Sequence, residues 1–178
     1  MIGTERVKQM HTYFLTSERM GFREMKSSDL PNLMTIFSDP IAMTYYQDTK
    51  TEQEALQWIQ WTKQNYQVFQ TGLWVVEDKQ AGNFIGLCGL IPHKIDGQVE
   101  IEIGYLLKRS YWNQGLATEA AGACLKYGFD VLKFNRIVSL ISPDNAPSIR
   151  VAQKIGMVRE KMVIEHEKCV EMYGVNKK

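Results

Sequence analysis

Residues 111–119 have the composition of an anion-binding loop, with the sequence Tyr-Trp-Asn-Gln-Gly-Leu-Ala-Thr-Glu. They follow a strand-like run at 99–107 and open an alanine-rich helical pattern over about 116–132. The first amides of a helix have no partner within it, and the helix dipole places about half a positive charge behind them. Gly115 lets a phosphate approach the backbone without meeting a Cβ. The expected ligand is a pyrophosphate, and the alternative is that Gly115 merely turns a strand into a helix.

The residues around Gly115 exclude two other phosphate-binding motifs. A Walker loop requires a Lys-Ser or Lys-Thr pair after its glycine, and none follows here. A dinucleotide fingerprint requires three glycines, whereas this loop has one.

Two carboxylates stand in the strand that precedes the loop. Glu100 and Glu102 are two residues apart, so they share one strand face, opposite Ile101 and Ile103. A glutamate is rarely buried without a partner. The pair therefore either serves chemistry, such as proton transfer, or belongs to a solvated face of the strand.

A third group of polar residues surrounds a short predicted helix near the C-terminus. Asn145 is expected to cap this helix, with Pro147 just inside its first turn. A cap side chain also lies beside exposed amides, so Asn145 could contact a ligand as well. Lys154, in the last turn, either interacts with the helix dipole or reaches a phosphate.

The apolar periodicity predicts an alternation of strands and helices around these groups. The predicted strands cover residues 14–25, 72–77, 84–92, 99–107, 136–142, 157–165 and 168–175. The predicted helices cover about 28–38, 51–69, 116–132 and 146–155, with turns at 78–83 and 93–98. Ser28 is the expected N-cap of the first helix, and Gly156 is the expected stop of the last one.

An aromatic cluster lies in and before the second predicted helix. Tyr45, Tyr46, Trp58 and Trp61 either form ordinary core packing or wall a pocket for an acceptor molecule.

Length and composition indicate one soluble α/β domain over residues 1–178, with residues 1–13 as a terminal extension. The chain has 178 residues, 44% of them hydrophobic and 23% charged, which is enough for a sizeable core. The net charge of +1 gives no bulk attraction to nucleic acid or to a membrane surface. No apolar run approaches the roughly 20 residues of a membrane span, and residues 1–10 do not resemble a signal peptide. We therefore expect a cytoplasmic protein.

Cysteine and histidine placement gives no evidence for a metal site. The three cysteines, Cys88, Cys124 and Cys169, lack paired spacing, which favours a reducing compartment. Cys88 and Cys124 are expected in the core rather than as acyl-accepting nucleophiles. The histidines at positions 11, 93 and 166 fall in the N-terminus or in predicted turns, without metal-ligand spacing.

The loop resembles the acetyl-CoA pyrophosphate loop of the GNAT superfamily of N-acetyltransferases, whose pattern is Gln/Arg-x-x-Gly-x-Gly/Ala. Gly115 and Ala117 match its last two key positions, whereas Trp112 replaces the usual Gln or Arg. A Tyr-Trp pair before Gly-x-Ala-Thr-Glu resembles the branch of the ribosomal-protein N-terminal (alanine/serine) acetyltransferases. The run from Asn145 through Ser148 to Lys154-x-Gly-Met resembles a second motif of that branch.

The resemblance implies a single-domain GNAT fold of mixed α/β class. In that fold a central, mostly antiparallel and splayed sheet of six to seven strands is flanked by about four helices. It also implies acetyl-CoA as cosubstrate, without a metal. The implied cofactor-binding residues are Tyr105, Leu106, Leu107, Trp112, Asn113, Gln114, Gly115, Leu116, Ala117, Thr118, Asn145, Ser148 and Lys154.

The resemblance further implies direct attack of a primary amine on the thioester in a ternary complex. The Glu-Ile-Gly-Tyr run that begins at Glu102 matches one that places a carboxylate near the amine, so Glu102 is the expected base, ahead of Glu100. The tyrosine that often protonates the leaving thiolate is replaced by Ala152, which leaves Ser148 or a water molecule as the donor.

The acceptor and the assembly remain open at this level. The acceptor is either a protein N-terminal α-amine or a small-molecule amine such as a polyamine, antibiotic or amino acid. The protein is expected as a monomer or homodimer, without nucleic-acid or membrane partners. A non-catalytic acyl-CoA-binding sensor is the alternative to an enzyme.

Overall fold

A computed structural model describes residues 12–178, so His11 and most of the predicted terminal extension lie outside the described part. The strands are β1 Leu15–Thr16, β2 Met20–Arg23, β3 Leu73–Asp78, β4 Phe84–Ile95, β5 Gln98–Leu107, β6 Arg136–Ile141, β7 Val158–Glu165 and β8 Lys168–Asn176. The helices are α1 Leu30–Phe37, α2 Glu52–Phe69, α3 Leu116–Asp130 and α4 Ala146–Lys154, with 3-10 turns η1 Ser27–Asp29 and η2 Arg109–Tyr111.

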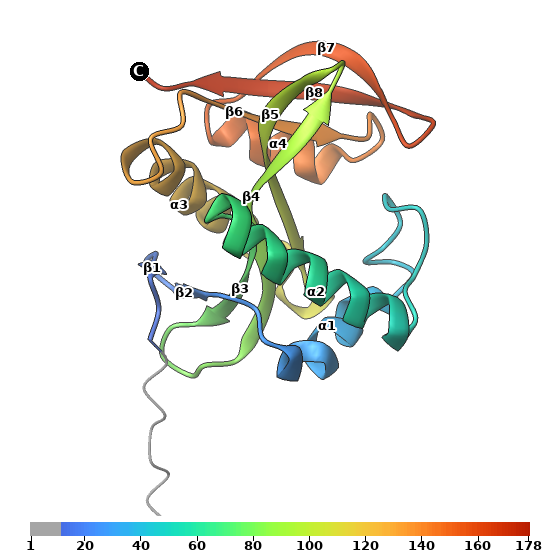
Figure 1. Cartoon of the computed structure of the whole chain (residues 1–178), viewed down its shortest axis with the longest axis vertical. Helices are drawn as coiled ribbons and strands as arrows, with labels where there is room; N and C mark the ends of the chain where they lie inside the picture. The colour runs from blue at the N-terminus through green and yellow to red at the C-terminus, as the bar shows by residue number, and fades with distance from the viewer. Residues whose placement is uncertain (1–11) are drawn as a thin grey trace, which may run out of the picture.

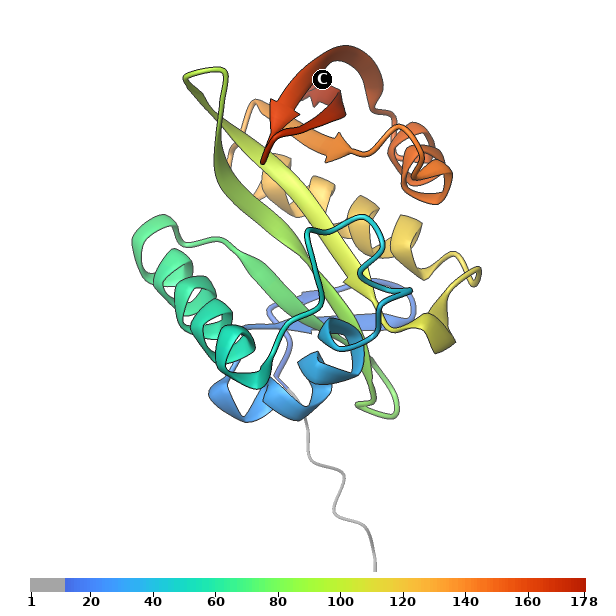
Figure 2. The same ribbon diagram turned by 90° about the vertical axis from the view of Figure 1, so that its right-hand side faces the viewer.

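All of these strands form one sheet, in the order β1-β2-β3-β4-β5-β6-β8-β7 (Figure 1). Every neighbouring pair is antiparallel except β5 and β6, which are parallel. Helices cover both faces, with α2 on one side and α3 on the other (Figure 2). The expected fold class, a mostly antiparallel sheet flanked by four helices, is confirmed.

The sheet has eight strands rather than the six or seven expected, because the predicted strand at 14–25 is broken. β1 and β2 form a small hairpin, in which Leu15 pairs with Phe22 and the Ser17 amide donates to the Met20 carbonyl at 2.9 Å. The polar residues between them turn the chain instead of extending it.

The predicted turn at 93–98 is also wrong. Only Asp96 and Gly97, at φ values of 48° and 81°, form the turn, and β4 continues to Ile95. His93 therefore lies inside a strand, directly opposite Glu100 on β5. The Asp-Gly pair marked the turn correctly, and the polar residues on either side of it belong to the paired strands.

Helix starts agree with the sequence at α2 and differ at α1. Thr51 caps α2, where its hydroxyl accepts from the Glu54 amide at 3.3 Å. Ser28 was expected to cap the first helix, but it lies within η1. The Asp29 carboxylate instead accepts a hydrogen bond from the Lys26 amide at 2.7 Å. The helical segment therefore begins with the 3-10 turn η1, before α1.

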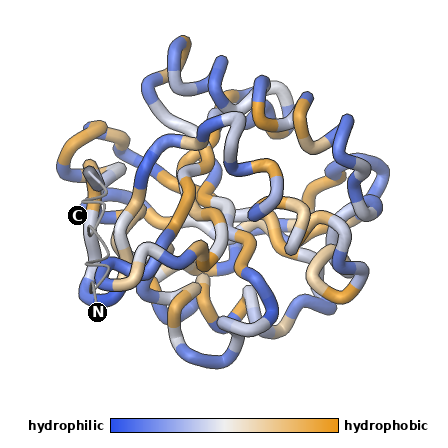
Figure 3. The backbone as a smooth tube through the Cα atoms, turned by 90° about the horizontal axis from the view of Figure 1, so that it is seen from below, coloured by the Kyte–Doolittle hydropathy of each residue, from blue (hydrophilic) through white to orange (hydrophobic). Residues whose placement is uncertain are grey.

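The core lies between the sheet and its helices. Figure 3 shows apolar segments gathered toward the centre of the molecule and hydrophilic segments prevailing at its periphery. Cys88 on β4 and Cys124 on α3 are both fully buried, so their predicted core placement is confirmed. Ile59 of α2 and Ile103 of β5 belong to the same buried cluster.

β5 and β6 diverge from each other toward one end. Their ladder consists of one register pair, Glu102 with Val138, although β5 pairs with β4 along its whole length. Beyond that pair, the Ser139 hydroxyl still reaches the Ile103 carbonyl at 3.3 Å. The remainder of β5, from Gly104 to Leu107, therefore has an open edge.

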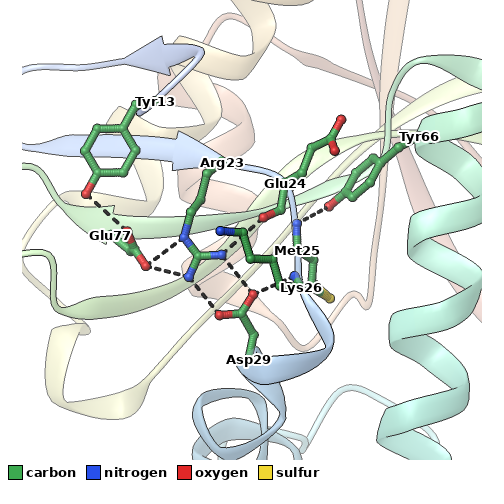
Figure 4. Close-up of polar contacts among 8 residues, drawn as sticks. All are labelled: Tyr13, Arg23, Glu24, Met25, Lys26, Asp29, Tyr66 and Glu77. Carbon is green, nitrogen blue, oxygen red and sulfur yellow. Dashed lines mark hydrogen bonds and ion pairs between the residues drawn. The ribbon is translucent and has the colours of Figure 1, made fainter. Parts of the chain in front are cut away.

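A buried ion cluster joins β2, β3 and η1 at the far end of the sheet (Figure 4). The Arg23 guanidinium contacts Asp29 at 2.7 and 2.8 Å and Glu77 at 2.6 and 2.9 Å. The Tyr13 hydroxyl also donates to Glu77, at 3.1 Å. Both acidic residues are less than 5% exposed, so the guanidinium compensates two charges removed from water.

Candidate active site

One cavity, of about 510 Å³, lies at the open edge of β5, between the start of α3 and one side of α4. It brings together twelve of the thirteen residues expected to bind the cofactor. These are Tyr105, Leu106, Leu107, Trp112, Asn113, Gly115, Leu116, Ala117, Thr118, Asn145, Ser148 and Lys154. Gln114 does not line the cavity, because its side chain turns back to donate to the Ser110 carbonyl at 2.9 Å.

The loop before α3 presents a row of backbone amides that lack acceptors. Within residues 12–178, no group accepts a hydrogen bond from the amides of residues 113–118, and the first bond of α3 runs from Glu119 to the Gly115 carbonyl. Gly115 has a φ of 76°, a conformation that glycine adopts without strain. These amides converge on the cavity at a helix N-terminus, which is the geometry of an anion site.

The conformation of this loop is fixed by contacts to the β1–β2 turn. The Glu119 carboxylate accepts from the Ser17 hydroxyl at 2.6 Å and from Arg19 at 2.7 Å, while Arg19 also donates to the Gln114 carbonyl at 3.0 Å. Burial alone would raise the pKa of Glu119, but these hydrogen bonds hold it below its usual value. Glu119 therefore stays ionised and anchors the loop.

α4 contributes a cap and two cations. Asn145 accepts the Ser148 amide at 3.2 Å, so its predicted capping role is confirmed. Arg150 and Lys154 are four residues apart on α4 and both line the cavity. Neither forms an ion pair with a carboxylate of the described chain. Arg150 was not among the residues expected to bind the cofactor, although its spacing of four from Lys154 places both on one face of a helix.

Among residues 12–178, Tyr105 is the residue at the open edge of β5 whose amide and carbonyl both lack a partner. Backbone amides and carbonyls point to alternate sides of a strand from one residue to the next. The Lys108 amide donates to the Ile85 carbonyl on β4, so the amide and carbonyl of Tyr105, three residues earlier, face β6. On that edge the Ile103 carbonyl already accepts from Ser139, and the Leu107 carbonyl accepts from the Trp112 indole at 2.8 Å. The Tyr105 amide and carbonyl remain available to an extended ligand.

A second cavity, of about 750 Å³, lies next to the first, where β5 and β6 separate. All four predicted acceptor-pocket aromatics line it: Tyr45, Tyr46, Trp58 and Trp61. Glu102 also lines it, whereas Glu100 lines neither cavity and is held by Arg136 at 3.3 Å. The two cavities meet where β5 leaves β6, and Tyr45 and Tyr46 line both of them. The residues that they share are Thr44, Tyr45, Tyr46, Tyr105, Leu106, Asn145 and Ser148.

His93 lies between two carboxylates in the second cavity. Its Nδ1 is 2.6 Å from Glu102 and its Nε2 is 3.2 Å from Glu165, at the end of β7. The hydrogen bond to Glu102 raises the pKa of His93 above its usual value, against the opposing effect of burial, and the charge of Glu165 adds to the rise. His93 was not expected at the site, because its position was predicted to lie in a turn.

Two hydroxyl groups lie near the junction of the cavities. The Ser148 hydroxyl has no hydrogen-bond partner among the described residues, and the Tyr105 hydroxyl donates to the Ser148 carbonyl at 3.2 Å. Burial raises the pKa of Tyr105 to about 12, so the phenol keeps its proton at neutral pH. Ala152 is 1% exposed and lines neither cavity.

A family model, the acetyltransferase (GNAT) domain, matches residues 19–158, which is most of the chain. This chain is a member of the GNAT acetyltransferase family. It is 40% identical over 160 residues to the uncharacterized protein YkkB of Bacillus subtilis, an alignment that covers 89% of this chain and 93% of YkkB.

Solved structures of the family share this fold. A GNAT-family acetyltransferase from Bacillus anthracis matches with a TM-score of 0.76 and 28% identity, over 91% of this chain and 97% of that one. A complex of RimL, described as a ribosomal L7/L12 alpha-N-protein acetyltransferase, with coenzyme A has a TM-score of 0.76 and 18% identity, over 90% and 95% of the two chains. At 18% identity, the likeness to RimL concerns the fold alone.

Two further properties concern the described residues of this acetyltransferase. Between residues 12 and 178, no helix has the length and hydrophobicity needed to cross a membrane. In the same range, His, Cys, Asp and Glu side chains form no group of three or more that could hold a metal ion.

Proposed function

We propose that this acetyltransferase moves the acetyl group of acetyl-CoA to a primary amine, by direct attack in a ternary complex. The observation that supports this most is the meeting of two cavities at the splay of β5 and β6. One cavity has the free amides and cations that suit a phosphorylated cofactor, and the other has a carboxylate and aromatic walls that suit an amine. A sensor that only binds acyl-CoA would not need the second.

The first cavity is proposed to bind the cofactor through its charge. The amides of residues 113–118 would hold the pyrophosphate, and Lys154 and Arg150 would reach phosphate oxygens. The pantetheine arm would lie beside Asn145 and Ser148 and pair with the free backbone groups of Tyr105, as a short strand does.

The second cavity is proposed to hold the acceptor and its base. Glu102 takes a proton from the ammonium group, the amine nitrogen bonds to the acyl carbon, and the carbon–sulfur bond breaks. Backbone groups at residues 105–107 polarise the thioester carbonyl. The second proton that the nitrogen loses on forming the amide passes to the leaving thiolate, through Ser148, Tyr105 or water.

We propose a protein N-terminal α-amine as the first candidate acceptor, with small-molecule amines as the alternative. An α-amine, with a pKa near 8, is far more often unprotonated at neutral pH than an alkyl amine near 10. The open cavity of about 750 Å³ has room for the first residues of a peptide. The free state of all three cysteines fits the proposed cytoplasmic location.

A panel assay tests this function. Release of free CoA from acetyl-CoA would be measured with N-terminal peptides, polyamines, amino acids and aminoglycosides as acceptors. Saturable release with one class identifies the acceptor. Tight binding of acetyl-CoA without release for any amine would instead support the sensor.

Gly115→Val is expected to weaken acetyl-CoA binding at least about tenfold, or about 1.4 kcal/mol, because the branched side chain would occupy the place of the pyrophosphate. Gly97→Val is a matched control: Gly97 also has a positive φ, of 81°, with no atom near its missing Cβ, and it lies outside both cavities. Calorimetry on both folded variants separates ligand exclusion from backbone strain. Equal affinities in the two variants would make the loop only a structural turn.

Trp61→Ala is expected to raise the acceptor KM or lower kcat, while leaving acetyl-CoA affinity unchanged. Trp61 lines only the second cavity and is 43% exposed, so its removal should not unfold the protein. Phe69→Ala is the control, because Phe69 is exposed on the same helix and lines neither cavity. Steady-state kinetics that cannot tell the two variants apart would contradict the acceptor pocket.

A further inference from the structure

The contacts of His93 place an imidazole between two carboxylates that come from different strands. His93 belongs to β4, Glu102 to β5 and Glu165 to β7, and the three side chains are between 18% and 27% exposed. Glu165 is also 3.0 Å from Nε2 of His166, at the tip of the β7–β8 hairpin. The ring is therefore held from both sides, and one of its partners is the proposed base.

The geometry determines the protonation state that suits this arrangement. A neutral imidazole has one N–H donor, and the other nitrogen carries a lone pair that repels a carboxylate oxygen. Both nitrogens of His93 face such oxygens, at 2.6 and 3.2 Å, so both contacts are favourable only in the imidazolium form. The pKa of His93 is raised in the same direction, first by its hydrogen bond to Glu102.

Other charged or titratable residues also lie near the ring, but they do not take the place of Glu102 or Glu165 as its partners. Glu100, opposite His93 on β5, pairs with Arg136 at 3.3 Å, and Arg136 also holds Glu160 at 2.5 Å. Tyr46 also lines the cavity, and although it is 44% exposed, desolvation of its hydroxyl and the charge of Glu102 raise the pKa of the phenol, so it stays neutral. Lys168, on the hairpin strand β8, lines the cavity and donates to the Tyr46 carbonyl at 3.2 Å.

We propose that His93 is the positioning residue of the base, held by Glu165 so that its imidazolium orients the Glu102 carboxylate for the attack. This inference rests on the proposed function, in which Glu102 accepts the proton of the amine. One carboxylate oxygen of Glu102 is committed to His93, which leaves the other free to face the acceptor.

Variants of His93 separate its hydrogen bond from its charge. His93→Leu removes both, and we expect kcat to fall about tenfold while the KM for acetyl-CoA stays unchanged. His93→Asn keeps an N–H donor near the place of Nδ1, so it should recover part of kcat. Lys94→Met, on the neighbouring exposed residue that lines neither cavity, is the control and should match the wild type.

A double-mutant cycle tests whether His93 acts through Glu102. The variant that combines Glu102→Gln and His93→Leu should be no slower than Glu102→Gln alone, because the second change removes the support of a base already lost. Independent, additive losses would overturn the positioning role. Normal rates in both His93 variants would also overturn it, provided that Glu102→Gln is slow. A full-rate Glu102→Gln enzyme would instead reject the proposed base.

A spectroscopic measurement makes the inference testable even if a His93 variant does not fold. The ¹⁵N resonances of the His93 ring should titrate above the ordinary histidine value of about 6.5 in the wild type and shift downward in Glu165→Gln. A wild-type ring that titrates at the ordinary value, and does not respond to Glu165→Gln, would contradict the proposal.

Discussion

Glu102→Gln is expected to lower kcat about 10²-fold while leaving acetyl-CoA affinity nearly unchanged. Glutamine keeps the shape of the side chain and still offers an oxygen to His93, but it cannot accept a proton from the amine. Glu102 lies outside the cofactor cavity, so binding of acetyl-CoA should not change. Kinetics on saturating acetyl-CoA, combined with calorimetry, measure the two effects separately.

The pH dependence of this variant supplies a second measurement. An alkyl amine with a pKa near 10 is unprotonated in roughly one molecule in a thousand at neutral pH. Raising the pH deprotonates the amine in solution, so part of the lost rate should return. Glu100→Gln is the matched control and should have a much smaller effect, because Glu100 lines neither cavity. Equal losses from both variants would indicate a shared water network, and a full rate would remove Glu102 from the mechanism.

Arg23→Met is expected to lower the free energy of unfolding by about 3–5 kcal/mol. The substitution leaves Asp29 and Glu77 buried and close together without the guanidinium that contacts both. Such a loss is a large part of the 5–15 kcal/mol that stabilises a typical domain. Arg23→Lys should recover only part of it, because an ammonium group cannot make the forked contacts to two carboxylates. Urea denaturation, monitored by circular dichroism, measures the difference.

Arg159→Met is the control for this cluster. Arg159 also pairs with a glutamate, Glu171, at 2.7 Å, but the arginine side chain is 52% exposed. An exposed pair contributes little to stability, so this variant should unfold close to the wild type. If Arg23→Met were equally stable, the buried cluster would not hold β2, β3 and η1 together.

The periodic elements of this fold could be predicted from sequence because each has a local physical cause. The start of the second helix at about Thr51, the Asp-Gly turn and the stop at Gly156 depend on a few residues each, and the structure has them where expected. The break between β1 and β2 and the extension of β4 to Ile95 were missed. Both depend on which neighbouring strand offers a partner, and that information is not local.

The residues of the candidate site also differ in whether the local sequence could predict them. The loop at Gly115 could be identified because a glycine before a helix gives a local geometry that suits an anion. The roles of Arg19 and Glu165 could not, because each contacts a residue far away in the sequence: Glu119 for the first and His93 for the second. The ion cluster around Arg23 was missed for the same reason. Side chains that support a site from a distance follow from the fold and not from a motif.

The single register pair between β5 and β6 also has a mechanical meaning. If the two parts of the sheet move relative to each other, they pivot about Glu102 and Val138, where they remain joined. Leu107 lies five residues further along, roughly 16 Å away at the rise of a strand. A change of about five degrees would then shift the far end of the splay by roughly 1.4 Å while hardly displacing Glu102. Such a motion would therefore change the space beside Leu107 much more than the position of the Glu102 backbone.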